Sequence, residues 1–169
     1  MSGAVLEGLA PVLSADTRVL VLGSFPGAAS LQARQYYAHP QNHFWKILQA
    51  LWPQHPLPPA GPDGYADRCA WLLDRGLGLW DVYQSCEREG SLDTSIRKAR
   101  VNDFQGLLGR APHRAAVAHN GGESFRHAKA VRASLGVEIP SLRLPSTSPA
   151  NASWSFEKKL NAWHEAMAR

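Results

Sequence analysis

Cysteine is scarce in this sequence. Its 169 residues include two cysteines, Cys69 and Cys86, and neither belongs to a Cys-x-x-Cys pair. A disulfide framework and a four-thiolate metal cluster are therefore excluded. The simplest interpretation is a reduced protein of the cytoplasm.

Long apolar segments are also missing. No run of about 18 apolar residues occurs, so no membrane-spanning helix is expected. The first residues, MSGAVLEGLAPVL, have no basic stretch before their short apolar run, which argues against a secretion signal. We expect a soluble protein that does not associate with membranes.

The charge excess is small. The 18 Lys and Arg residues outnumber the 14 Asp and Glu residues and give a net charge of +4. This balance suits a polyanionic partner without requiring one. A chain of this length with 44% hydrophobic residues is typical of one domain, here residues 1–169, and we expect a monomer.

The hydrophobic pattern alternates between strands and helices. Strands are predicted at 18–23, 77–82, 114–118 and 137–144, and helices at 44–51, 66–76, 103–108, 123–135 and 156–167. This alternation predicts an α/β fold, a three-layer α/β/α sandwich around a short, mostly parallel four-stranded sheet. In such folds functional groups collect where the strands end.

Two segments near the first strand carry candidate chemistry. Gly23-Ser-Phe-Pro-Gly27 follows the strand, and its small residues allow backbone amides to approach an anion or a base edge. A tight turn without a ligand is the alternative. The second segment, Gln35-Tyr-Tyr-Ala-His-Pro-Gln-Asn-His-Phe-Trp45, holds tyrosines able to stack on a base. Two structural alternatives are equally suited to this segment: Asn42 could cap a helix, and the aromatic residues could fill the core.

These two segments resemble the uracil-DNA glycosylase superfamily. GSFPG followed by YYAHPQNHFWK is similar to its first motif and the segment after it, and Leu144-Pro-Ser-Thr-Ser-Pro149 to its late Pro-Ser loop. The mismatch-specific uracil glycosylases carry Asn inside the first loop, where this chain has Ser24 and Phe25. The sequence therefore looks more like the hypoxanthine-DNA glycosylase branch, in which the resemblance assigns the catalytic amide to Asn42.

The resemblance also implies roles for other residues. Asp81, at the end of the second strand, is a candidate to read the base edge or to act as general base, with a merely solvated or capping Asp as the alternative. Asn120, after the third strand, is a candidate donor to the base or a turn residue. Tyr37 is expected to stack on the base. The base is further expected to contact Gly23, Ser24, Phe25 and Gly27, and DNA phosphate to contact Ser146, Thr147 and Ser148.

The expected partner is double-stranded DNA that contains a deaminated base. No His-x-Glu with Cys-x-x-Cys pattern of a zinc deaminase occurs, so we expect neither a metal nor another cofactor. Three alternatives stay open: a mismatch-type uracil-DNA glycosylase, a nucleotide-binding module without catalysis, and a hydrolase with Ser24 as nucleophile. The last lacks a Gly-x-Ser-x-Gly elbow.

Overall fold

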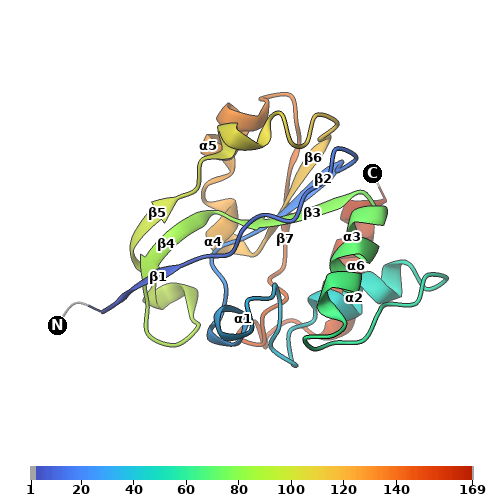
Figure 1. The fold of residues 1–169 in the computed structure, drawn as a ribbon, viewed down its shortest axis with the longest axis horizontal. Helices are drawn as coiled ribbons and strands as arrows, with labels where there is room; N and C mark the ends of the chain where they lie inside the picture. Colours follow the sequence, from blue (N-terminus) through green and yellow to red (C-terminus); the bar gives the residue numbers. More distant parts are fainter. Residues whose placement is uncertain (1–2, 169) are drawn as a thin grey trace.

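A four-stranded parallel sheet forms the centre of the molecule (Figure 1). A computed structural model describes residues 3–168. In the sheet, the strands lie in the order β3 (Leu77–Asp81), β2 (Val19–Gly23), β6 (Ala116–Asn120) and β7 (Ser141–Leu144), with every neighbouring pair parallel. The predicted fold class is confirmed.

Strand β2 is an inner strand because both of its faces are apolar. Val21 and Leu22 are fully buried on opposite faces. Val21 lies beside Leu79 of β3 and Ala118 of β6 in the register of the sheet. A continuous apolar run of this kind is typical of a strand covered on both sides.

Three helices cover one face of the sheet: α2 (Phe44–Leu51), α3 (Tyr65–Asp74) and α6 (Phe156–Met167) (Figure 1). The core beneath them includes Phe44, Leu72 and Trp163, none of which is exposed. These helices match the predicted apolar periodicities. Gly76 has a φ of +76° just after α3, as expected of a residue that ends a helix.

The other face carries a second sheet that the sequence did not lead us to expect. It is antiparallel, with the order β1 (Val5–Glu7), β4 (Tyr83–Glu87) and β5 (Arg97–Val101). Also on this side lie the short helices η2 (Phe104–Leu107), α4 (Gly122–Phe125) and α5 (Ala128–Leu135). Every residue of β5 is exposed, so the strand has no buried face to produce an alternating pattern.

Two predicted elements are shorter than expected. The helix predicted over 123–135 is divided between α4 and α5, at a tight turn where the His127 amide donates to the Ser124 carbonyl. The strand predicted over 137–144 begins only at Ser141. Gly136, with a φ of +135°, opens a turn that the Ile139 amide closes on its carbonyl. Two further short helices, α1 (Ala28–Ala33) and η1 (Asp93–Ser95), were not predicted.

No helix within residues 3–168 combines the length and apolar character needed to cross a membrane.

Candidate functional site

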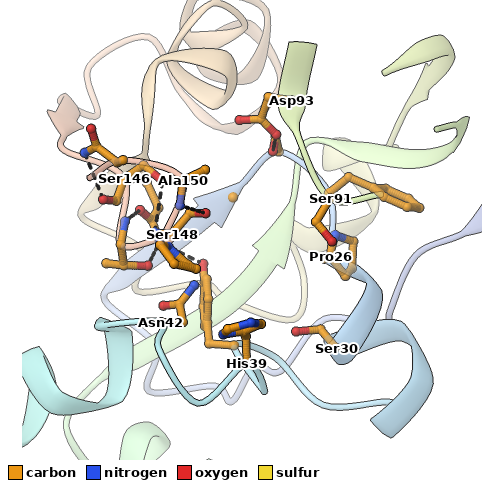
Figure 2. A pocket seen from close by; sticks show the side chains of 18 of the residues that line it. Pro26, Ser30, His39, Asn42, Ser91, Asp93, Ser146, Ser148 and Ala150 are labelled. Carbon is orange, nitrogen blue, oxygen red and sulfur yellow. Dashed lines mark hydrogen bonds between the residues drawn. The ribbon is translucent and has the colours of Figure 1, made fainter. Parts of the chain in front are cut away.

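A pocket of about 720 Å³ opens at the carboxyl ends of the parallel strands. Its wall includes the last residue of each of the four strands and the loops that follow two of them, namely Gly23–Ala29, Asp81, Asn120 and Leu144–Ala150. Figure 2 shows Ser146 and Ser148 on one wall, Pro26 and Ser91 on the opposite wall, and Asn42 and His39 below. The volume suits a small planar ligand such as a nucleobase with its sugar.

The Gly23–Gly27 loop leaves β2 in a fixed conformation. The Val82 and Tyr83 amides donate to the carbonyl oxygens of Gly23 and Ser24. A Cβ atom at position 23 would lie 2.6 Å from Asp81 Oδ1, so only glycine fits there without displacing Asp81. Gly27 is the residue just before α1. The loop thus brings backbone atoms to the pocket, as the sequence predicts.

Ser24 and Phe25 are both largely buried in the pocket wall. The Ser24 hydroxyl donates to Asp93 Oδ1 at 2.6 Å, which ties the loop to the η1 segment. It hydrogen bonds to a carboxylate and not to a histidine, so the geometry does not favour Ser24 as a nucleophile. The Phe25 ring packs in the second core cluster and lies beneath the Arg88 guanidinium, 5.3 Å from it.

Asp81, the last residue of β3, is the most electrostatically unusual group in the pocket. Its side chain is 5% exposed, and its buried Oδ2 has no hydrogen-bond partner among residues 3–168. Burial raises the pKa of this carboxyl to about 7, with a further increase from the charge of Asp93 and an opposing effect from Arg88. An unpartnered acceptor of this kind is available to a ligand.

Asn42 lines the pocket from the turn before α2. Its side-chain Oδ1 accepts a hydrogen bond from the Phe44 amide at 2.9 Å, although His43 is the residue that flanks the helix. Within the described chain, the side-chain nitrogen has no protein partner. The structure therefore supports a capping contact and also leaves part of the amide free for a molecule in the pocket.

Tyr37 lines the same pocket as Asn42 and has a strained backbone conformation, with a φ of +56°. Its ring stacks on Phe44 with centroids 4.1 Å apart. Its hydroxyl accepts a hydrogen bond from Asn120 Nδ2 at 3.2 Å. The tyrosine is thus fixed at both ends beside the pocket, and stacking on a base remains a proposal for it.

The Asn120 side chain joins β6 to the Pro-Ser loop. It accepts a hydrogen bond from the Thr147 amide at 3.0 Å and donates to Thr147 Oγ1 at 3.0 Å, besides donating to Tyr37. Its donors are therefore already engaged, which favours a clamp over a base-reading role. Thr147 is fully buried in the pocket wall, and its hydroxyl accepts the hydrogen bond from Asn120, so its expected contact with DNA phosphate stays a prediction.

We expect Asn120→Ala to lower the free energy of unfolding by about 2 kcal/mol or more, because it leaves the buried Thr147 amide and hydroxyl without partners. Chemical denaturation measures this loss. Asn151→Ala is the matched control in the same loop, since it removes one partly buried hydrogen bond to the Ser146 carbonyl and should cost about 1 kcal/mol. Equal stability of Asn120→Ala and the wild type would contradict the clamp and restore the base-reading interpretation.

Ser146 and Ser148 line the pocket with part of their surface exposed. Their hydroxyl oxygens accept hydrogen bonds from the amides of Ser148 and Ala150. The loop is held from behind by Lys159, a side chain only 1% exposed, which contacts the Ser148 carbonyl and His43 Nδ1, each at 3.3 Å. Sequence reasoning missed Lys159, although it lies on the apolar stripe of the last helix.

The segment from Ser91 to Thr94, which follows Arg88, forms a pocket wall that the sequence did not reveal. Arg88 is largely buried and donates to the Pro26 carbonyl at 2.6 Å. Ser91 Oγ accepts a hydrogen bond from the Ala28 amide at 2.9 Å. A buried arginine between polar residues has no periodic signal, so only the contacts identify its position.

The histidines near the pocket have structural partners. His39 accepts from the Gln41 amide, and His119 is fully buried with Ser124 beside its Nδ1. Burial lowers the pKa of His119 to about 4, so it is neutral at physiological pH. His39 and His43 are four residues apart, but both lie before α2, so they do not share one face of a helix. The described part of the chain contains no group of three or more His, Cys, Asp or Glu side chains placed to hold a metal.

Comparisons with known proteins identify the family of this chain. The family model described as the uracil DNA glycosylase superfamily matches residues 10–168. A protein named hypoxanthine DNA glycosylase from Methanosarcina barkeri (strain Fusaro / DSM 804) is 35% identical, with 96% of this chain and 98% of the relative covered. Another of that name, from Methanosarcina acetivorans, is 32% identical, covering 98% and 99%.

A solved structure shows the same fold. It is a solution NMR structure of a protein from Methanosarcina acetivorans, provisionally described as a uracil DNA glycosylase. The TM-score is 0.77 at 28% sequence identity, with 96% of this chain and 98% of the other covered. Because the family model spans nearly the whole chain, this protein belongs to the uracil DNA glycosylase superfamily, as its motifs predict.

Proposed function

We propose that this DNA glycosylase removes hypoxanthine from double-stranded DNA by hydrolysing the bond between the base and deoxyribose. The observation that carries the proposal is the meeting of Asn42 and Asp81 in one pocket, from segments far apart in the sequence. The names of the two Methanosarcina relatives support hypoxanthine as the base. A target base inside a duplex must be flipped out to reach such a pocket.

Hydrolysis of this bond depends more on orienting the attacking water than on a strong base that deprotonates it. When the purine departs as an anion, the sugar becomes oxocarbenium-like, and water adds to it without early deprotonation. Asn42 can orient this water through the part of its amide that Phe44 does not use. Because an amide is no general base, Asp81 is the residue that would take that task if it is needed.

The base edge would be read by Asp81 and the Gly23–Gly27 backbone. Hypoxanthine presents an N1–H donor, and the unpartnered Asp81 carboxylate is an acceptor. Tyr37 supplies a ring beside the base, and Ser146 and Ser148 offer hydroxyl and backbone groups to phosphate. Phosphate contacts position the DNA without reading its sequence. No step in this scheme uses a metal or a Schiff-base lysine.

We expect the purified protein, in buffer containing EDTA, to convert a deoxyinosine duplex into an alkali-labile abasic site without nicking the strand. Product analysis on a panel of duplexes that carry hypoxanthine, uracil, xanthine or no lesion tests this. Preference for uracil would support the mismatch-type alternative. Binding without base release from any duplex would support the non-catalytic module. A borohydride-trapped adduct or loss of activity with chelator would overturn the metal-free hydrolytic mechanism.

A further inference from the structure

Lys159 is a buried ammonium group that has no role in the reaction proposed so far. It lies in α6 and is only 1% exposed. Its Nζ contacts the Ser148 carbonyl and His43 Nδ1, each at 3.3 Å. Among residues 3–168, no carboxylate lies within 4.0 Å of this nitrogen. Lysine is almost never fully buried unless it is paired with an anion, so the missing anion needs an explanation.

Both contacts of Lys159 are with uncharged groups. An ammonium group has only donors, so His43 Nδ1 must be an acceptor and its ring uncharged. Burial, together with the charges of Lys159 and Lys46, lowers the pKa of His43, in agreement with a neutral ring. The Ser148 carbonyl also accepts from the Asn151 amide at 3.0 Å. These contacts therefore leave the positive charge of Lys159 without a countercharge.

The Pro-Ser loop in front of Lys159 presents donors and no negative charge. The hydroxyl oxygens of Ser146 and Ser148 accept from backbone amides, and neither hydroxyl donates to a protein group of the described chain. Each hydroxyl hydrogen is thus available to a ligand. Both side chains lie at the pocket in Figure 2. Residues 145–154 include no Asp or Glu. This arrangement fits a ligand with negatively charged oxygen atoms.

Helix α6 fixes the ammonium group behind the loop. Trp163, one helical turn after Lys159, is fully buried, and its Nε1 donates to the Pro145 carbonyl at 3.2 Å. The His43 amide donates to the Thr147 carbonyl at 3.0 Å, which ties the turn before α2 to the same loop. The charge is therefore in place before a ligand arrives.

We propose that Lys159 is a positioning residue that acts through the Pro-Ser loop, where its positive charge holds a DNA phosphate against Ser146 and Ser148. This inference rests on the proposed glycosylase function. A charge in the interior interacts more strongly than the same charge in water. Burial lowers the pKa of Lys159, and a phosphate bound nearby would favour its charged form. A strand anchored in this way has its nucleotide at the pocket in which Asn42 and Asp81 meet.

The test compares Lys159→Met with the wild type in single-turnover excision of hypoxanthine at increasing enzyme concentration. Methionine keeps much of the side-chain length and removes the charge. At about 0.1 M salt the half-saturating concentration should rise about tenfold, and its logarithmic dependence on salt concentration should lose a slope of about 0.9, the value for one phosphate contact. The maximal rate should stay within about threefold, because the Phe44 amide still fixes Asn42.

Lys158→Met is the matched control. Lys158 carries the same charge on the same helix, but it is exposed and does not line the pocket, so its loss should change the half-saturating concentration by less than about twofold. Lys159→Arg keeps the charge and should recover most of the affinity. Thermal melts should show Lys159→Met to be at least as stable as the wild type, since a buried charge without a countercharge does not favour folding.

The outcomes separate this inference from the proposed function. A wild type that excises no base overturns the function and this inference with it. With an active wild type, an unchanged half-saturating concentration in Lys159→Met overturns the inference alone. A loss of affinity with an unchanged salt slope, or a marked loss of stability, would also overturn it and assign Lys159 a structural role. An equal effect in Lys158→Met would replace it with general attraction of DNA by the helix.

Discussion

Asn42→Ala is expected to slow single-turnover excision of hypoxanthine by about 10²-fold or more, while lesion binding stays nearly unchanged. The size is that of removing one preorganised contact to a transition state. The Phe44 amide holds Asn42 Oδ1 at 2.9 Å, so the amide plane is fixed before substrate arrives. A fixed amide in the pocket wall orients water without reorganisation during the reaction.

The capping contact of Asn42 provides the control for this prediction. Loss of the hydrogen bond to the Phe44 amide should cost about 1 kcal/mol of stability, which thermal melts at the same pH will show. Asn42→Asp keeps an acceptor for that amide and for water, but it adds negative charge close to the departing base. We expect its rate to lie between those of the wild type and Asn42→Ala. Near-wild-type cleavage by folded Asn42→Ala would remove Asn42 from the mechanism and assign the water to Asp81.

The parallel sheet and its large helices were predictable because their burial is periodic or continuous. Strand β2 is apolar throughout, and α2 repeats apolar residues on one face, so each pattern has one simple explanation. The antiparallel sheet was not predictable in the same way. Its strand β5 is exposed along its whole length and is held by backbone pairing with β4, which leaves no trace in hydrophobicity.

The sequence also predicted which residues lie together at the site, because the strand pattern determines where the strands end. Residues at the ends of parallel strands must meet at one edge, so Gly23, Asp81 and Asn120 could be grouped from the strand pattern alone. Their individual contacts could not. Asn120 donates its hydrogen bonds to Tyr37 and Thr147, and Ser24 donates to Asp93. These contacts depend on loop conformations that only the folded chain defines.

Asp81→Ala is expected to lower the excision rate by about 10²-fold and to remove a pH dependence that the wild type shows near neutrality. Because the pKa of Asp81 is raised to about 7, its carboxylate form, the acceptor for the base N1–H, becomes populated as the pH rises through that value. The wild-type single-turnover rate should therefore increase between pH 6 and pH 8. Asp81→Asn keeps a carbonyl acceptor but cannot ionise, so we expect about a tenfold loss and a flat profile. A loss as large as that of Asp81→Ala would instead indicate a general base.

The stability of the protein gives an independent measurement of the same ionisation. A carboxyl whose pKa is raised by folding stabilises the native state at low pH; this contribution declines above the ordinary pKa of 3.8 and is fully lost above about 7. Asp81→Asn should therefore raise the melting temperature more at pH 8 than at pH 5.

Asp93→Asn tests the electrostatic origin of the raised pKa. It keeps an acceptor for the Ser24 hydroxyl and removes the negative charge that raises the Asp81 pKa, so the midpoint of the rate profile should move to lower pH. A wild-type rate that is independent of pH would contradict this assignment. So would a pH profile whose midpoint is the same in the wild type, Asp81→Asn and Asp93→Asn. Either result would show that another group governs the reaction and that Asp81 acts without changing its charge.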